Sequence, residues 1–199
     1  MSLKGEKTKQ AIREKAYQLF AEKGFKDVTM KDICGLTGLS RGGLYRHYES
    51  TGQIFLEIVN DFANEQKSEI SAKIEQHVPA AMILEELLAK YAGEMIDSEN
   101  SLSLAIYEFY SNPAISKENN SVKKQYEISK STWIELINYG IATKEFNSVN
   151  PESIFNIIVF AYQGVRMYSK LMEMDNDIPT QIINEIKGLL LPKEAQHGK

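Results

Sequence analysis

The chain has 199 residues, 43% of them hydrophobic and 25% charged, and its formal net charge is −4. This composition is ordinary for a globular protein with a real core, and the length allows one domain or a small domain plus a larger one. The single cysteine, Cys34, excludes a disulfide framework. No signal peptide and no apolar run of membrane-spanning length is present, so we expect a cytoplasmic protein without a membrane partner.

The charge is unevenly distributed along the chain. Residues 1–50 hold ten Lys/Arg and six Asp/Glu, a net charge of +4. Residues 51–199 hold thirteen Lys/Arg and twenty-one Asp/Glu, a net charge of −8. A basic N-terminal part on an acidic body is typical of a small domain that reads nucleic acid.

The first predicted element is a helix over residues 7–23. Its apolar residues repeat at helical spacing along one face, namely Ile12, Ala16, Leu19 and Phe20. Gly24 is suited to end this helix, and Phe25 is expected to fold back onto the segment that follows.

Two short helices with a tight turn are predicted over residues 28–48. Thr29 and Asp32 have the spacing of a capping box at the start of the first helix. Gly38 can take the positive φ that a sharp reversal needs, and Ser40 is a good N-cap for the second helix.

The second of these helices has an apolar face and a polar face. Leu44 and Tyr48 are four residues apart and are expected in the core, whereas Arg41, Tyr45 and Arg46 lie on other faces. The pattern predicts a helix-turn-helix whose second helix enters the major groove of DNA, although other small helical hairpins share it.

The rest of the chain reads as six more helices, and no segment shows strand alternation. Their predicted ranges are 50–74, 80–97, 101–111, 122–142, 151–172 and 179–191. The first is about 36 Å long at 1.5 Å per residue, enough to link a head to a body. The stretch 116–121 is expected to be a loop, and the tail from Lys193 to be mobile. The predicted fold is all-α.

The run GFKDVTMKDICGLTGLSRGGLYRHYESTGQIF resembles the DNA-binding domain of the tetracycline-repressor-like (TetR/AcrR) family of transcriptional regulators. The match covers about the first 60 residues, with GF after the first helix, T-x-x-D-I, the G-L-S turn and G-x-LY in order. The resemblance implies a helix-turn-helix domain over residues 1–50 and a ligand-binding and dimerisation domain over residues 51–199. It also implies a ligand-responsive regulator, most often a repressor, that a small-molecule inducer releases from a palindromic operator.

The resemblance places nine residues at or near double-stranded operator DNA: Thr29, Lys31, Arg41, Gly42, Gly43, Tyr45, Arg46, His47 and Thr51. The fork of Arg41 suits guanine O6 and N7, and the two glycines allow close approach of the helix. Tyr45 and His47 are expected on phosphates. Thr51 departs from the family pattern, in which a phosphate-binding lysine is common.

The body is expected to bind the inducer, whose identity the sequence does not reveal. The candidate pocket residues are Tyr91, Met95, Tyr107, Glu108, Tyr110, Tyr126, Trp133 and Phe160. Ordinary core packing is the alternative for each of the aromatic residues. Glu108 lies in the most apolar predicted helix, where an unpaired carboxylate is costly, so it either meets a cationic group of the ligand, bonds to tyrosines or faces solvent.

The last two predicted helices carry more apolar surface than one body can bury. Pairing them across a two-fold axis as a four-helix bundle would bury the excess, so a homodimer is expected. The residues assigned to this interface are Ile158, Tyr162, Ile182, Ile183, Ile186 and Leu190.

No chemistry-bearing motif is found. The three histidines have no partner at metal-ligand spacing, and no phosphate-binding loop follows a strand. We therefore expect no enzyme activity, no metal and no cofactor. The alternative function is a non-catalytic helical adaptor whose hairpin contacts protein, and a steep salt dependence of duplex binding would argue against it.

Overall fold

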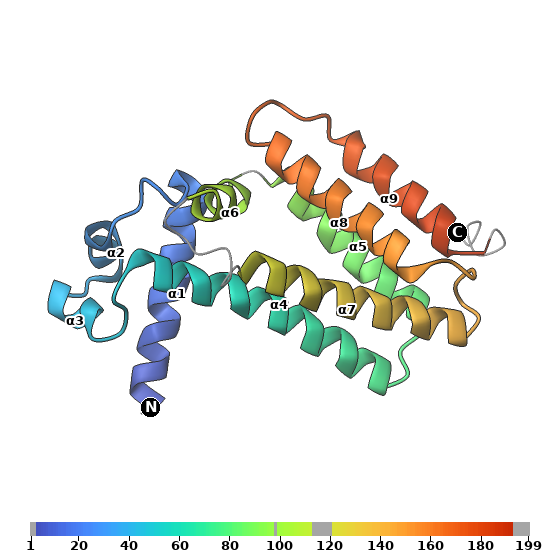
Figure 1. The fold of residues 1–199 in the computed structure, drawn as a ribbon, viewed down its shortest axis with the longest axis horizontal. Helices are drawn as coiled ribbons and strands as arrows, with labels where there is room; N and C mark the ends of the chain where they lie inside the picture. The colour runs from blue at the N-terminus through green and yellow to red at the C-terminus, as the bar shows by residue number, and fades with distance from the viewer. Residues whose placement is uncertain (1–2, 98, 113–120, 193–199) are drawn as a thin grey trace. The chain divides into compact units, whose positions relative to one another are not determined.

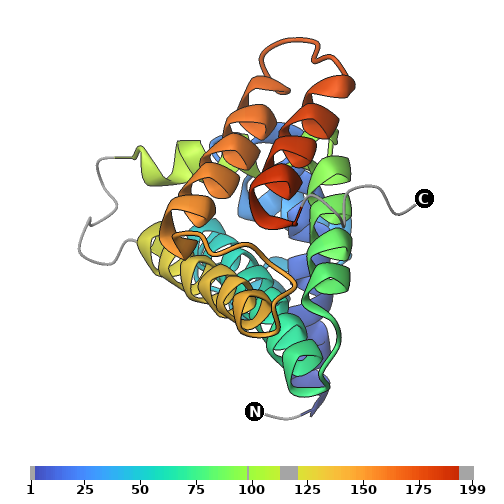
Figure 2. The same ribbon diagram turned by 90° about the vertical axis from the view of Figure 1, so that its right-hand side faces the viewer.

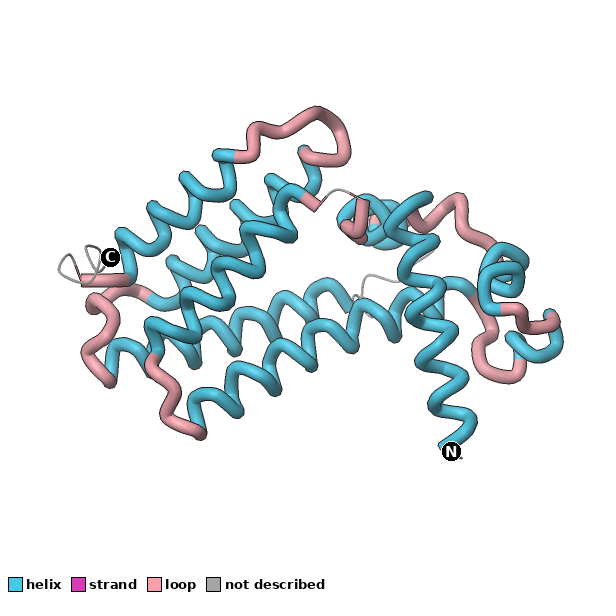
Figure 3. The backbone as a smooth tube through the Cα atoms, turned by 180° about the vertical axis from the view of Figure 1, so that it is seen from behind, coloured by secondary structure: helices cyan, strands magenta, loops and turns pink. Residues whose placement is uncertain are grey.

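In the computed structural model, which describes residues 3–97, 99–112 and 121–192, every regular element is a helix (Figures 1 and 3). The helices are α1 (Leu3–Lys23), α2 (Met30–Thr37), α3 (Arg41–Tyr45), α4 (Thr51–Glu75), α5 (Ala80–Ile96), α6 (Ser103–Tyr110), α7 (Ser121–Ala142), α8 (Pro151–Tyr168) and α9 (Asp177–Leu190). The predicted all-α fold is confirmed for these residues.

The helix boundaries differ from the sequence prediction mainly at three ends. α1 begins at Leu3 instead of residue 7, α8 stops at Tyr168 instead of residue 172, and α9 begins at Asp177. The predicted loop at 116–121 falls almost wholly outside the described residues, and the tail from residue 193 falls wholly outside them.

The chain forms two compact units, which do not coincide with the two segments expected from sequence. Unit 1 contains Met1–Phe62 and Glu99–Lys124, and unit 2 contains Ala63–Ser98 and Gln125–Lys199. α6 therefore belongs with the helix-turn-helix in unit 1. From sequence, this helix is expected in the body.

An aromatic cluster explains why α6 joins unit 1. The ring of Phe109 on α6 lies 4.7 Å from the ring of Phe25 and 5.1 Å from the ring of Phe55, measured between centroids. Phe20 on α1 adds an edge contact to Phe55 at 5.0 Å. Such pairs bury large apolar rings in favourable tilted geometry, so α6 completes the core around α1 and α4.

Unit 2 is built around α5, which contacts both α8 and α9, and the views of Figures 1 and 2 show α8 and α9 side by side. Trp133, Leu136 and Ile137 of α7 are at most 1% exposed within this core. The remaining part of α4 contributes Ile70 to the same core.

The loop between α7 and α8 closes two helix ends of unit 2. The backbone N–H of Asn147 donates to the carbonyl of Leu190 at 2.7 Å, and its side chain donates to Leu191 at 3.1 Å. Glu145 accepts a hydrogen bond from the backbone N–H of Ala81 at 3.0 Å. Helix ends leave backbone groups without intrahelical partners, so these bonds fix the C-terminus of α9 and the N-terminus of α5.

Candidate nucleic-acid interface and ligand-binding core

The start of α2 has the predicted capping box. The hydroxyl oxygen of Thr29 accepts from the backbone N–H of Asp32 at 3.3 Å, and the carboxylate of Asp32 accepts from the backbone N–H of Thr29 at 2.9 Å. Hydrogen bonds from the Thr29 side chain and backbone hold the pKa of Asp32 below its usual value. The capping box orients the first turn of α2, whose free backbone N–H groups suit an anion.

The turn and the second helix also form as predicted. Gly38 adopts φ 71° and ψ 9°, the left-handed conformation, and Ser40 accepts from the backbone N–H of Gly43 at 3.1 Å. Leu44 and Tyr48 are 0% and 1% exposed, so their assignment to the hairpin core is confirmed.

The opposite side of α3 is open to solvent. Arg41, Gly42 and Arg46 are exposed, and Tyr45 is 47% exposed. A Cβ added to Gly42 would meet nothing within 4 Å, so packing inside unit 1 does not require glycine at this position. The missing side chain instead leaves room for a ligand to approach the backbone.

The other predicted DNA-contacting residues surround this helix in the chain. Thr29 and Lys31 are exposed, and Gly43, His47 and Thr51 are half-buried. All nine candidates therefore belong to unit 1 and none is buried. Their contacts with DNA stay predictions.

A polar network that the sequence analysis missed lies next to α3. Tyr48 donates its hydroxyl to Glu57 on α4 at 2.7 Å, and Arg13 on α1 donates to the same hydroxyl at 3.3 Å and to Glu57 at 3.2 Å. Lys9 pairs with Glu57 at 3.0 Å, and Arg13 also pairs with Asp61 at 3.0 Å. The network joins α1, the end of the hairpin and α4.

The network changes the acidity of its members. Burial raises the pKa of the Tyr48 hydroxyl, and the hydrogen bond to Glu57 raises it further. Burial acts to raise the pKa of Glu57 too, but hydrogen bonds from Tyr48 and Lys9 outweigh it and leave the pKa lowered. Glu57 is thus held as a carboxylate. Sequence periodicity identified Tyr48 only as core, because it does not locate the partner of a hydroxyl.

The predicted ligand-binding residues separate into three places. Tyr91, Met95 and Trp133 are at most 7% exposed in the core of unit 2, and Tyr126 packs against that core. Phe160, on α8, is 66% exposed, and its ring lies 6.4 Å from the ring of Tyr126. The three residues of α6, Tyr107, Glu108 and Tyr110, belong to unit 1.

Glu108 has a partner that the sequence analysis did not consider. Its Oε2 accepts from the backbone N–H groups of Phe25 at 2.7 Å and Lys26 at 3.0 Å. The carboxylate therefore has partners in the turn between α1 and α2 and needs no ligand group to satisfy it.

The interior of unit 2 contains polar side chains among its aromatic residues. Gln66 donates to the hydroxyl of Tyr91 at 3.0 Å, and the Tyr91 and Tyr162 rings lie 4.4 Å apart. Tyr162 donates to Glu94 and accepts from Arg166. Burial raises the pKa of both tyrosines, so both hydroxyls are neutral hydrogen-bonding groups. The sequence gives no signal for Gln66, Glu94 or Arg166, because a polar residue on an amphipathic helix is usually solvated.

The six residues predicted for the dimer interface are mostly covered within one chain. Five of the six are at most 8% exposed within one chain: Ile158, Tyr162, Ile183, Ile186 and Leu190. They face the core of unit 2, and only Ile182 is half-buried. These side chains pack inside one chain, and their contact with a second copy stays a prediction.

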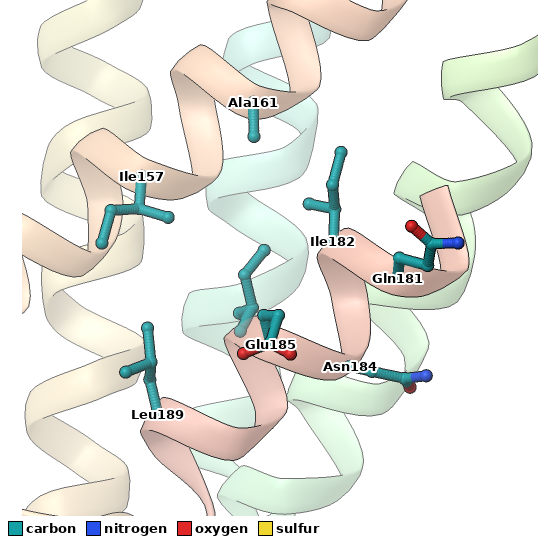
Figure 4. A pocket seen from close by; sticks show the side chains of 8 residues that line it. Ile157, Ala161, Gln181, Ile182, Asn184, Glu185 and Leu189 are labelled. Carbon is teal, nitrogen blue, oxygen red and sulfur yellow. The ribbon is translucent and has the colours of Figure 1, made fainter. Parts of the chain in front are cut away.

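A different apolar surface of α8 and α9 remains open. Ile157, Phe160 and Leu189 are 48%, 66% and 44% exposed. A groove between the two helices is lined by Ile157, Ala161, Gln181, Ile182, Asn184, Glu185, Ile186 and Leu189 (Figure 4). We call Ile157, Phe160, Ala161, Ile182 and Leu189 the α8/α9 face.

Neither a metal site nor a membrane span is found in the part of the chain that the structure describes. No three His, Cys, Asp or Glu side chains among residues 3–97, 99–112 and 121–192 gather closely enough to hold a metal ion. None of the described helices combines the length and the apolarity that crossing a bilayer requires.

Two family models match the chain. Residues 12–58 match the model described as bacterial regulatory proteins, tetR family, and residues 83–179 match a tetracyclin repressor-like C-terminal domain. The first match spans the helix-turn-helix and the start of α4.

Individual proteins agree with these matches. The chain is 26% identical over 147 residues to the uncharacterized HTH-type transcriptional regulator YfiR of Bacillus subtilis, covering 73% of this chain and 71% of that protein. It is 25% identical over 156 residues to the HTH-type transcriptional repressor KstR2 of Rhodococcus jostii, covering 77% of this chain and 76% of that protein. The solved structure of a TetR transcriptional regulator from Chloroflexus aurantiacus covers 96% of this chain and 100% of its own, with a TM-score of 0.73 and 21% identity, and therefore shares the fold.

Proposed function

The chain belongs to the tetR family of bacterial regulatory proteins, and from that premise we propose that it represses transcription from an operator and leaves the operator when a small molecule binds. It is a DNA-binding transcriptional regulator and not an enzyme. Regulators of this family bind operator DNA, usually as dimers, and respond to small-molecule ligands. The name of the KstR2 relative supports repression over activation.

The open side of α3 is the observation that carries this proposal. A short helix with Arg41, Tyr45 and Arg46 exposed, and with Leu44 anchored in the core, can enter a major groove without disturbing its own packing. We assign Arg41 to a guanine edge, because its guanidinium offers two parallel donors. We assign Thr29 and Lys31, at the start of α2, to a phosphate.

The interior of unit 2 is the proposed inducer site. Tyr91, Trp133 and Tyr126 supply aromatic surface there, and Gln66 and Asn156 already bond to tyrosine hydroxyls at 3.0 Å and 2.7 Å. Sites for small molecules commonly combine apolar walls with a few placed polar groups. Phe160 and Glu108 are left out of this site, since one is exposed on α8 and the other is bonded to backbone in unit 1.

The α8/α9 face is the proposed dimer contact. Its exposed apolar side chains lie on neighbouring helices of one unit, so a second copy related by a two-fold axis can pair α8 and α9 with their counterparts. Such pairing forms a four-helix bundle, as the sequence analysis expected, but through Ile157, Phe160 and Leu189.

A helical adaptor that uses the hairpin to contact protein is not favoured. The segment that such an adaptor would use, residues 12–58, is the segment that matches DNA-binding regulators. Two exposed basic residues, Arg41 at the start of α3 and Arg46 just after it, also suit a polyanion.

The test is selection of duplexes from a random-sequence library by the full chain, followed by titration of the selected duplex at several salt concentrations. We expect a palindromic consensus and a steep fall of affinity with salt, because phosphate contacts release counterions. Absence of any enriched sequence, with affinity that does not depend on salt, would contradict the proposal.

A further inference from the structure

We propose that Glu108 is a positioning residue for DNA binding: its carboxylate holds the turn between α1 and α2 and thereby fixes the start of α2 for its contact with phosphate. The inference rests on the proposed function, because it concerns how unit 1 is prepared for the operator. Glu108 itself is assigned no contact with DNA or with an inducer.

A single carboxylate oxygen satisfies two consecutive backbone groups. Oε2 of Glu108 lies 2.7 Å from the nitrogen of Phe25 and 3.0 Å from the nitrogen of Lys26. The preceding N–H, that of Gly24, bonds to the carbonyl of Phe20 within the end of α1. The next two N–H groups, those of Phe25 and Lys26, therefore find their acceptor on α6. Hydrogen bonds to an ionised acceptor are stronger than neutral ones.

The turn is shaped to admit the carboxylate. Gly24 has φ +78°, a conformation that favours glycine, and a Cβ added there would lie 2.6 Å from Oε2 of Glu108. The next residue of α6, Phe109, places its ring 4.7 Å from the ring of Phe25. Thus two residues of α6 contact the turn: Glu108 accepts hydrogen bonds from its backbone, and Phe109 packs against the side chain of Phe25.

The held turn leads directly into α2. Val28, two residues beyond Lys26, is 4% exposed and donates its N–H to the carbonyl of Phe25 at 3.4 Å. Thr29 follows as the N-cap of α2. If the turn loses its contact with α6, the N-cap and the first N–H groups of α2 are displaced. These are the groups assigned to phosphate.

Charge and hydrogen bonding make opposite predictions for this residue, which gives a sharp test. Removing a negative charge near DNA tightens binding if charge alone matters. Glu108→Ala removes both the charge and the acceptor, Glu108→Gln removes only the charge and keeps one oxygen, and Glu108→Asp keeps the charge but is one methylene too short. The control is Glu22→Ala, because Glu22 is exposed on α1 and has no partner within residues 3–97, 99–112 and 121–192.

The probe is the duplex that the parent protein selects from a random library. Affinity is measured per folded molecule, well below each unfolding midpoint. We expect Glu108→Ala and Glu108→Asp to bind this duplex about tenfold more weakly, and Glu108→Gln and Glu22→Ala to stay within about twofold of the parent or to bind more tightly. If Glu108→Ala fails to fold, Glu108→Asp decides the question.

A double-mutant cycle with Lys31→Ala tests the route through α2. If Glu108 acts by placing the start of α2, Glu108→Ala should weaken duplex binding less in the Lys31→Ala background than in the parent. Unchanged affinity of Glu108→Asp, full additivity with Lys31→Ala, or a Glu108→Gln variant as weak as Glu108→Ala would each overturn the inference. A parent protein that selects no duplex would instead overturn the proposed function.

Discussion

Replacing Phe160 by glutamate should dissociate the dimer and leave each chain folded. Phe160 is 66% exposed in one chain, so its substitution removes little of the packing inside unit 2. Full burial of such a side chain is worth about 1.5–3 kcal/mol. Because about two thirds of the side chain is still open, dimerisation gains about 1–2 kcal/mol per copy, or about 2–4 kcal/mol for the two copies. The dimer dissociation constant should rise roughly 30- to 700-fold.

Sedimentation velocity over a concentration series measures this change. Met82→Glu is the matched control, since Met82 is 54% exposed on α5, outside the α8/α9 face. Ile183→Glu is a second control, for a residue of the core. Ile183 is 7% exposed, so this substitution should lower the unfolding temperature of the chain, whereas Phe160→Glu should not. A parent protein that is monomeric at micromolar concentration, or a Phe160→Glu variant that associates as the parent does, would refute the assignment.

Three further outcomes are expected in unit 1. Arg41→Ala should cost about 1–3 kcal/mol of operator binding and relax discrimination at one base pair per half-site, which a panel of single-base operator variants measures. Tyr48→Phe should lower the free energy of unfolding in urea by about 1–3 kcal/mol, because Glu57 and Arg13 lose a hydrogen-bonding partner. The folded pKa of Glu57 is lowered, so its stabilisation is complete above the ordinary glutamate pKa of about 4.3 and is lost as the pH falls through the folded value. Urea titrations from pH 7 to pH 3 should therefore show the parent and Glu57→Gln converging in stability at the acid end, and a constant difference across that range would contradict the role of Glu57.

The helix-turn-helix was predictable because its signals are local. The capping box at Thr29, the left-handed Gly38 and the N-cap Ser40 each act within four residues of chain, and each has the predicted geometry. A short-range hydrogen bond or a sterically restricted dihedral depends on few neighbours, so one sequence contains the information.

The proposed dimer face was not predictable in the same way. Ile157 and Ile158 are adjacent in sequence, yet one is 48% exposed and the other 1%. On a helix that is apolar on most sides, hydrophobic spacing shows that two faces are buried but not which one faces its own chain. The choice is set by α5, which packs against both α8 and α9.

Glu108 shows the same limit at the level of one side chain. A carboxylate in an apolar helix and a glycine at the end of α1 are separate observations in the sequence, 84 positions apart in number. In the structure each accounts for the other, since the carboxylate accepts from the backbone N–H groups of Phe25 and Lys26 and Gly24 leaves the space in which Oε2 reaches them. An isolated charge in an apolar segment is therefore evidence of a partner, but backbone N–H groups satisfy it as well as a ligand does. For that reason the residue is better assigned to the preparation of α2 than to recognition of an inducer.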